Sequence, residues 1–278
     1  MGRKNVSIEP FELYAIRYAN HSGRHLSDNY LGGDSHEGGA DLDYYVWVAR
    51  RSDRVFVIDT GFDEEAAKAR GRTLLRMPSE ALSRIGIAAA DVDQVILTHL
   101  HYDHAGTLDS FPKARFHVQD AEVAYATGRC MCHSPLRAPY SIEDVTRFVR
   151  CVYHGRVAFH DGTTEIVPGL TLHRTGGHTA GLQVVRVWTK RGWVVIASDA
   201  SHFYDNFSSG RSFPILHSLG DMLEGFQTIK ALAEDEDHIV PGHDPLVMKV
   251  YRPPSPELEG IAVRLDEAPI KPWRDLLP

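Results

Sequence analysis

Short apolar stretches separated by turn residues run through most of this chain. Each has roughly the length of a strand buried in a sheet, and each is bounded by Gly, Pro, Asp, Asn or Ser. The strands predicted in this way span 44–49, 55–58, 95–97, 116–118, 165–167, 170–174, 182–188, 193–197 and 239–240. Turns at 51–53 and 190–192 join two pairs of them as hairpins.

Helical spacing alternates with these strands. Ser79 is placed to cap a short helix that ends at residue 85, and Asp120 is placed to begin another. Apolar residues also follow helical spacing over 142–152 and 219–229, where they form one face. The pattern predicts an α/β protein with two packed sheets and helices outside them. No linker divides the chain, so we expect a single domain over residues 1–278.

The composition narrows the choice of partners and compartment. The chain is 43% hydrophobic and 24% charged, with a net charge of −7, which favours neither a nucleic-acid backbone nor an anionic membrane. It has no apolar run long enough to span a bilayer, and residues 1–10 lack the apolar core of a secretion signal. Three cysteines are too few for a disulfide framework. We therefore expect a cytoplasmic protein, monomeric or homodimeric, with a small-molecule substrate.

A dense group of metal-binding residue types stands directly after the strand predicted at 95–97. It consists of His99, His101, Asp103 and His104. Alternate side chains of a strand share a face, so His99 and His101 can point the same way, and the following turn can bring Asp103 and His104 round to them. Imidazole nitrogen and carboxylate oxygen suit a divalent ion such as zinc. Four donors so close together exceed what one ion readily accepts, which predicts two metals.

Three further donors follow predicted strands elsewhere in the chain: His178, Asp199 and His243. Each stands beside glycine or another small residue that lets the backbone turn tightly. A lone histidine after a strand is usually a solvated loop residue. The complete set, however, supplies five imidazoles and two carboxylates, which favours a metal centre.

In order and approximate spacing, these donors resemble the motif of the metallo-β-lactamase superfamily. Within it, the segments 101–106, 177–181, 199–201 and 241–244 resemble the N-acyl-homoserine lactonase branch. The resemblance extends from the turn at 59–61 to His243. It implies a four-layer αβ/βα sandwich of two mixed sheets flanked by helices, with the metals at one edge.

The resemblance also implies a role for each donor. The ligands of one zinc would be His99, His101 and His178. The ligands of the other would be Asp103, His104 and His243. Asp199 would bridge the two ions, and Asp59 would orient a ligand from beneath. Iron, manganese and cobalt are alternatives to zinc.

The reaction implied is the opening of a lactone ring by a hydroxide that bridges the two metals. Asp103 would carry the proton. If the substrates were N-acyl-homoserine lactones, the activity of the enzyme would be quorum-quenching. One position departs from the branch: a tyrosine three residues after the bridging aspartate is replaced by His202. A histidine can still donate to the substrate oxygen, and Tyr204 is the alternative donor. The expected catalytic residues are therefore Asp103, His202 and Tyr204.

Several alternatives stay open at this point. A thioesterase of the glyoxalase II type or a phosphodiesterase would use the same ligands, although the tail at 253–278 lacks the basic character of a glutathione site. A mononuclear iron dioxygenase and a non-catalytic binding domain are further alternatives for the function. Apolar residues after Asp199 form either a substrate wall or core: Phe203, Phe207, Phe213, Ile215, Leu216 and His217. The segment of residues 1–40 is expected to cover the site or to form a dimer contact.

Overall fold

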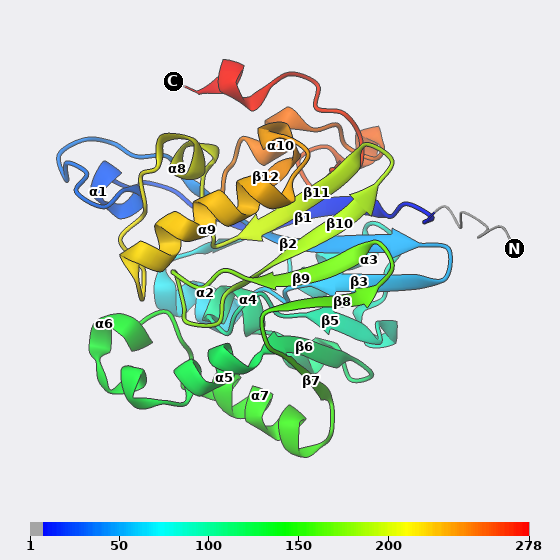
Figure 1. Ribbon diagram of the computed structural model, residues 1–278, viewed down its shortest axis with the longest axis horizontal. Coiled ribbons are helices and arrows are strands. Elements are labelled where there is room, and N and C mark those ends of the chain that lie inside the picture. The colour runs from blue at the N-terminus through cyan, green and yellow to red at the C-terminus, as the bar shows by residue number, and fades with distance from the viewer. Residues whose placement is uncertain (1–7, 278) are drawn as a thin grey trace, which may run out of the picture.

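In the computed structural model, which describes residues 8–277, the strands form two sheets and helices lie outside both of them (Figure 1). Within this range, no helix has the length and apolar character needed to cross a bilayer. The expectation that no secretion signal is present rests mostly on residues 1–7, which lie outside the described residues.

The larger sheet contains eight strands in the order β13-β1-β2-β3-β5-β6-β7, with β4 paired to β1. The strands β1, β2 and β3 are antiparallel, whereas β3, β5, β6 and β7 are parallel. The bounds are β1 Glu12–His21, β2 Leu42–Arg51, β3 Arg54–Ile58, β4 Thr73–Leu74, β5 Gln94–Ile96, β6 Arg115–Gln119, β7 Val157–His160 and β13 Ala262–Arg264.

The smaller sheet contains five strands in the order β12-β11-β10-β9-β8, and only β12 runs parallel to its neighbour β11. The bounds are β8 Thr163–Val167, β9 Leu170–Arg174, β10 Gln183–Thr189, β11 Gly192–Ser198 and β12 Ile239–Pro241. Both sheets are therefore mixed.

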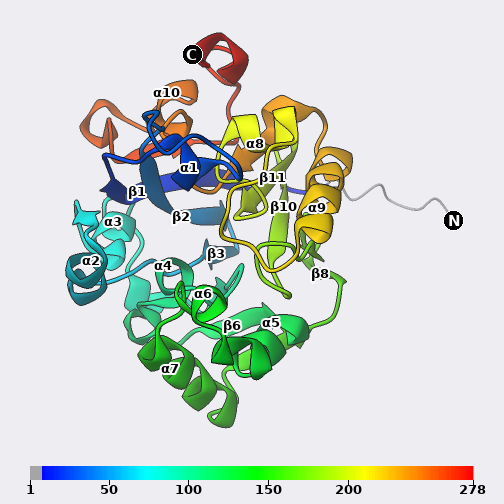
Figure 2. The same cartoon turned by 90° about the vertical axis from the view of Figure 1, so that its left-hand side faces the viewer.

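Helices cover the outer faces of the two sheets. The helix α9 runs along the five-stranded sheet, while α5 and α7 lie on the far side of the molecule, near β6 (Figure 2). The bounds are α1 Leu26–Asn29, α2 Glu64–Arg70, α3 Pro78–Ser83, α4 Tyr102–Ala105, α5 Asp120–Ala126, α6 Ser134–Arg137, α7 Ile142–Tyr153, α8 Tyr204–Ser209, α9 Leu219–Leu232 and α10 Val247–Val250.

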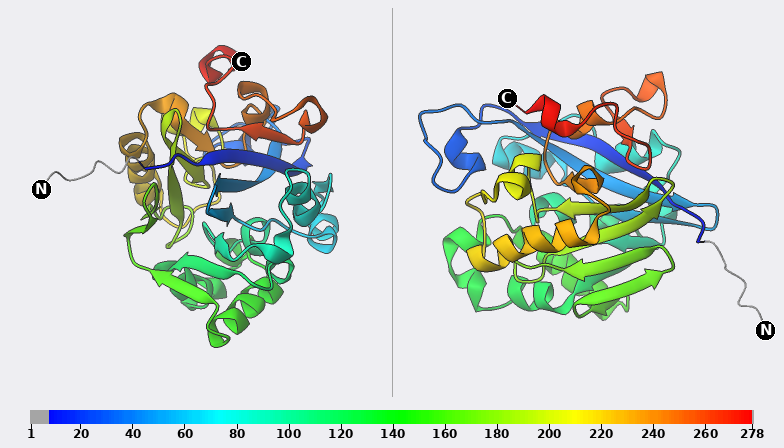
Figure 3. Two further views of the ribbon diagram at one scale, coloured as in Figure 1. Left: turned by 90° about the vertical axis from the view of Figure 1, so that its right-hand side faces the viewer. Right: turned by 45° about the horizontal axis from the view of Figure 1, so that its top comes forward.

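The core lies on both faces of the larger sheet. In β1, Leu13 and Ala15 pack between the two sheets, whereas Tyr14 and Ile16 pack under the outer helices. The sequence did not predict β1, which was expected to belong to a covering segment, because polar residues such as Arg17, Asn20 and His21 interrupt its apolar run. Instead, β1 pairs with both β2 and β13 and crosses the molecule beside the C-terminal segment (Figure 3).

Both predicted boundaries of one helix are wrong, since α3 also ends at Ser83 rather than at residue 85. Ser79 does not cap α3, because the helix begins at Pro78 and its N-cap is Met77. Proline suits the first turn of a helix, where its fixed φ is helical and its missing N–H has no partner to lose. The single domain over residues 1–278 stays a prediction.

Candidate metal centre

All seven predicted donors follow strand ends at one edge of the two sheets. His99, His101, Asp103 and His104 follow β5 of the larger sheet. The other three come from the smaller sheet: His178 from the loop between β9 and β10, Asp199 from the end of β11 and His243 from the end of β12. Strand ends of two packed sheets thus bring together residues that are far apart in the sequence.

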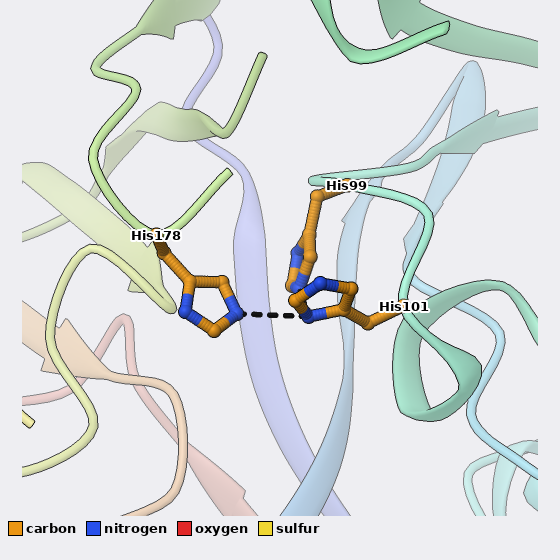
Figure 4. A group of neighbouring side chains, drawn as sticks. All are labelled: His99, His101 and His178. Atoms are coloured by element: carbon orange, nitrogen blue, oxygen red, sulfur yellow. Dashed lines mark hydrogen bonds between the residues drawn. The ribbon is translucent and has the colours of Figure 1, made fainter. Parts of the chain in front are cut away.

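The imidazoles of His99, His101 and His178 face one another (Figure 4). The Nδ1 atom of His101 lies 3.0 Å from Nε2 of His99 and 2.9 Å from Nε2 of His178. His99 is fully buried, and the other two are 4% exposed. Three nitrogens that converge in this way offer one divalent ion three ligands.

A second group consists of Asp103, His104 and His243. The carboxylate of Asp103 lies 3.7 Å from Nε2 of His104 and 3.9 Å from Nε2 of His243. Its side chain is 11% exposed, so it also borders the cavity above the group.

Asp199 lies between the two groups. Its Oδ1 atom is 3.3 Å from Nε2 of His104 and 3.0 Å from Nε2 of His243. Its Oδ2 atom is 3.1 Å from Nε2 of His178. One carboxylate therefore presents one oxygen to each group. We call these seven residues the metal centre.

Four of the five histidines are held through their other ring nitrogen. The Nδ1 atoms of His178 and His243 lie 2.7 Å and 3.0 Å from the carbonyl oxygens of Ile215 and Asp43, so their Nδ1–H groups can donate there. Nδ1 of His104 lies 2.7 Å from the carboxylate of Asp59, the orienting contact that the resemblance implies. Nδ1 of His99 lies 3.1 Å from Oγ1 of Thr98. Such contacts fix the tautomer that leaves Nε2 free for a metal.

Strained backbone supports this arrangement from beneath. Asp59 and Ser198 have φ values of 61° and 45°, which non-glycine residues rarely adopt. Thr98 connects them, because its hydroxyl donates to Asp59 at 2.8 Å and lies 2.9 Å from the hydroxyl of Ser198. These hydrogen bonds of Thr98 hold the ends of β3 and β11 close to the strand that precedes the histidines.

The electrostatics of the metal centre fit a cation. Burial lowers the pKa of His99 and of His101 well below the usual value, and neighbouring imidazoles lower each further. Burial also opposes charge on His104, but nearby carboxylates outweigh it and raise the pKa of that imidazole well above the usual value. Nε2 of His104 and Oδ1 of Asp199 are buried and make no hydrogen bond within residues 8–277. Neutral imidazoles beside carboxylates that attract positive charge are what a divalent metal requires, so these residues could hold a metal ion.

Glu122 is a supporting residue that the sequence analysis did not single out. Its carboxylate is fully buried and accepts hydrogen bonds from the N–H of Leu100 and the hydroxyl of Tyr140, at 3.0 Å and 2.9 Å. It also accepts from the hydroxyl of Thr179 and the N–H of Gly181, at 2.5 Å and 3.2 Å. Glu122 thus ties the His99–His101 segment to the loop that follows His178. A glutamate at the start of a predicted helix gave no sign of this role.

The two other expected catalytic residues lie in different places. His202 borders the cavity, with Nε2 3.0 Å from Oδ2 of Asp199 and its ring stacked on Phe213 at 3.5 Å between centroids. Tyr204 does not join the metal centre: its ring stacks on Trp273 in the buried core, with a centroid distance of 5.0 Å. This corrects the expectation that Tyr204 reaches inward, because helix α8 begins at Tyr204 and turns its side chain toward the C-terminal segment.

The cavity above the metal centre has a volume of about 170 Å³. Of the expected apolar wall, Ile215 lines this cavity, while Phe203 and Phe207 belong to the core. The remaining lining includes Tyr44, Tyr102 and three arginines. Arg24 is one of them, so the N-terminal segment does lie beside the site.

Comparison with known proteins gives consistent matches. The sequence model of the metallo-β-lactamase superfamily matches residues 40–253. An N-acyl homoserine lactonase from a Bacillus species is 28% identical over 184 residues, which cover 61% of this chain and 68% of the relative. The N-acyl homoserine lactonase AiiB from Agrobacterium fabrum (strain C58) is 26% identical over 223 residues, covering 73% of this chain and 80% of the relative. A solved quorum-quenching N-acyl homoserine lactone lactonase superposes with a TM-score of 0.73 at 25% identity, covering 88% of this chain and 97% of its own.

Proposed function

Because the chain belongs to the metallo-β-lactamase superfamily, we propose that it is a dinuclear zinc hydrolase that opens the ring of an N-acyl homoserine lactone or a related lactone. The superfamily, the two-sheet fold and the hydrolase class predicted from the sequence are confirmed. The lactone substrate and the pair of zinc ions are the new part of this proposal.

The position of Asp199 is the observation that carries the proposal. One oxygen faces His178 and the other faces His104 and His243, as a carboxylate shared by two ions would. Since the donors come from both sheets, the proposal also requires that the two sheets form one domain.

In the proposed centre, His99, His101 and His178 would hold one zinc. Asp103, His104 and His243 would hold the other, and Asp199 would be shared between them. Bound zinc would supply Lewis acidity, which polarises the ester carbonyl and lowers the pKa of water to near neutrality.

Two residues of the chain would act on the substrate. Asp103 borders the cavity and can carry a proton from the attacking water to the departing ring oxygen. His202 is the polar side chain beside Asp199 in the cavity. Burial, the first cause, lowers the pKa of His202 to about 3, so the imidazole is neutral and has a single N–H. Nε2 lies 3.0 Å from Oδ2 of Asp199, so donation to the substrate carbonyl oxygen requires this N–H to leave that carboxylate.

The test is an indicator assay of zinc-loaded protein against lactones, thioesters, phosphodiesters and cephalosporins, together with metal analysis. We expect turnover of lactones and about two zinc ions per chain. Asp103→Asn should nearly abolish turnover without unfolding the protein, as judged by circular dichroism. Turnover of thioesters alone, or one iron per chain, would overturn the lactonase proposal.

A further inference from the structure

Three arginines line the cavity above the metal centre: Arg24, Arg70 and Arg72. We call them the arginine rim. Arg70 ends helix α2 and Arg72 immediately precedes β4, while Arg24 lies in the N-terminal segment just before α1. All three are half-buried, and they share the cavity with Asp103, His202 and the histidines of the metal centre.

Within residues 8–277, none of these guanidinium groups forms an ion pair with a carboxylate. Arg70 donates to the carbonyl oxygens of Ala138 and Tyr140, at 3.0 Å and 3.1 Å. Arg72 donates to the hydroxyl of Tyr102 at 3.2 Å and to the carbonyl of Arg70 at 2.7 Å. The oxygens that these two arginines contact are all neutral. The charge of Asp103, which lines the same cavity, acts on Arg72 without forming an ion pair with it.

Arg24 is held in the same manner. It donates to the side-chain oxygen of Asn29 and to the carbonyl of Asp28, both at 2.7 Å. The nearby carboxylates of Asp28 and Asp41 form no ion pair with Arg24 in the described residues; Asp28 accepts from the N–H of His25 and Asp41 from the N–H of Gly23. A charge that is partly removed from water without a partner is unfavourable, and an arriving anion relieves that cost.

His21 separates two of the arginines without adding charge. Its Nδ1 atom lies 3.1 Å from Nη1 of Arg24, and its Nε2 atom lies 3.2 Å from Nη1 of Arg72. Burial first, and then the two arginines, lower the pKa of His21 to about 4, so the ring is neutral near pH 7. It therefore acts as a rigid spacer between the two guanidinium groups.

The rim keeps donors free for a ligand. Nε of Arg70 and Nη2 of Arg72 make no hydrogen bond to the described part of the chain, whereas the other nitrogens of both side chains are mostly engaged. The ring of Tyr102 lies under the guanidinium of Arg70 at 3.9 Å and its hydroxyl accepts from Arg72, so one residue fixes both. Guanidinium groups with fixed orientation match the planar geometry of a carboxylate.

We propose that the arginine rim is a carboxylate subsite and that the lactone opened at the metal centre carries a carboxylate group. This rests on the proposed lactonase function and narrows its substrate class. Hydrolysis would add one water: its hydroxide forms the new acyl C–O bond as the acyl bond to the ring oxygen breaks, and its other proton goes to that ring oxygen. The new carboxylic acid releases a proton to solvent and gives a hydroxy-dicarboxylate.

The charge of the cavity lining supports a charged substrate. The cavity of about 170 Å³ is open to solvent, and Ala138 lines both it and a neighbouring cavity of about 730 Å³, so its volume sets no limit on the length of the substrate. An N-acyl homoserine lactone is uncharged and would leave the three guanidinium groups without an anion. A small ring ester with a carboxylate uses both the metal centre and the rim.

The experiment compares two lactones that share one ring, 5-oxotetrahydrofuran-2-carboxylate and its 2-carboxamide, with zinc-loaded protein. We expect kcat/KM to be about 10- to 100-fold higher for the carboxylate, because charge-assisted hydrogen bonds form only with it. Arg72→Gln should reduce this ratio to below about threefold at unchanged zinc content. The matched control, Arg84→Gln, changes an exposed arginine outside the cavity and should leave the ratio unaltered.

Each outcome separates the two proposals. Equal turnover of both lactones, or an unchanged ratio in Arg72→Gln, would overturn the carboxylate subsite and leave the lactonase proposal standing. A preference for the same ring bearing a phosphate ester would overturn the assignment of the anion as a carboxylate.

If neither lactone is turned over but an N-acyl homoserine lactone is, the carboxylate subsite is overturned and the lactonase proposal stands. If no lactone at all is turned over, the lactonase proposal fails, and binding then decides the role of the rim. Calorimetry should show 2-hydroxyglutarate, the ring-opened carboxylate, binding zinc-loaded protein about tenfold or more tightly than the ring-opened carboxamide. Arg72→Gln should abolish that difference. Equal affinities would overturn the subsite.

Discussion

The histidines of the metal centre and the arginines above them line the same cavity, but their surroundings differ. Most of the histidines are buried and held by a second contact to a carbonyl, a hydroxyl or a carboxylate. The arginines are half-buried and contact neutral oxygens and the imidazole of His21. The metal centre thus attracts positive charge, whereas the arginine rim carries positive charge without an ion pair to a carboxylate in the described residues.

This difference separates what the site does from what it accepts. The metal centre is built from residues that fit a pair of cations, so its geometry is tied to the reaction. The arginine rim involves no residue of that centre, so it can change with the substrate while the chemistry is kept. Substitutions in the metal centre should therefore lower metal content and turnover, whereas substitutions in the arginine rim should change substrate preference.

The largest effect is expected from Asp199→Asn. An amide has only one oxygen, so it cannot present an oxygen to each of the two ligand groups. Metal content should therefore fall, and kcat/KM should drop by on the order of 1,000-fold. Elemental analysis and lactone turnover measure the two effects. The exposed Asp93→Asn is the control. Two zinc ions retained with full activity would show that Asp199 is not a shared ligand.

Glu122→Gln should have the next largest effect. Four donors converge on this carboxylate, and an amide would turn an N–H₂ group toward some of them. Since supporting residues typically contribute 10- to 100-fold to metal affinity, we expect a loss of about that size. Competition with a zinc chelator measures the metal affinity. The control, Glu165→Gln at an exposed position, should bind zinc as tightly as the unsubstituted protein.

Thr98→Val removes the hydroxyl that connects the two strained residues beneath the metal centre. The loss should lower the free energy of unfolding by about 1–3 kcal/mol and weaken zinc binding modestly. Urea denaturation of the metal-free protein gives the first quantity. Thr98→Ser keeps the hydroxyl and should restore both; equal loss in the two variants would point to packing instead.

The smallest effect is expected in the arginine rim from Tyr102→Phe. This change removes the acceptor for Arg72 while keeping the ring under Arg70. The preference for the carboxylate lactone should fall about two- to fivefold, the size of one neutral hydrogen bond, and metal content should not change. Tyr153→Phe, at a position 87% exposed, is the control. A fall in metal content instead would show that the two regions are not independent.

Much of the fold was predictable from the sequence because strands with turn residues at both ends are easy to recognise. The strand 170–174 has the predicted bounds, and the strands around 44–49, 95–97 and 193–197 differ by a few residues at most. β1 was missed because Arg17, Asn20 and His21 interrupt a strand whose two faces are both buried. The long antiparallel pairing with β2 stabilises it, and no local pattern reports that pairing.

The donors of the candidate site were predictable because metal ligation restricts the residue types and leaves them in a compact motif. The supporting and rim residues were not. Glu122 acts through contacts to loops far from it in sequence, and the three arginines converge from separate segments. Tyr204 shows the converse, since its proximity to Asp199 in sequence gave no information on which way helix α8 would turn it.

The metal centre takes ligands from both sheets, since His99 to His104 follow the larger sheet and the other donors follow the smaller one. Ions at this seam would bind only the folded chain, and such ligands stabilise a protein by about 2.7 kcal/mol at a free concentration 100 times the dissociation constant. If the proposed zinc ions bind there, starving a cell of zinc would lower the free energy of unfolding and populate the unfolded chain, which proteases cleave. The amount of protein that persists would then follow the metal supply, in addition to the rate at which each copy works.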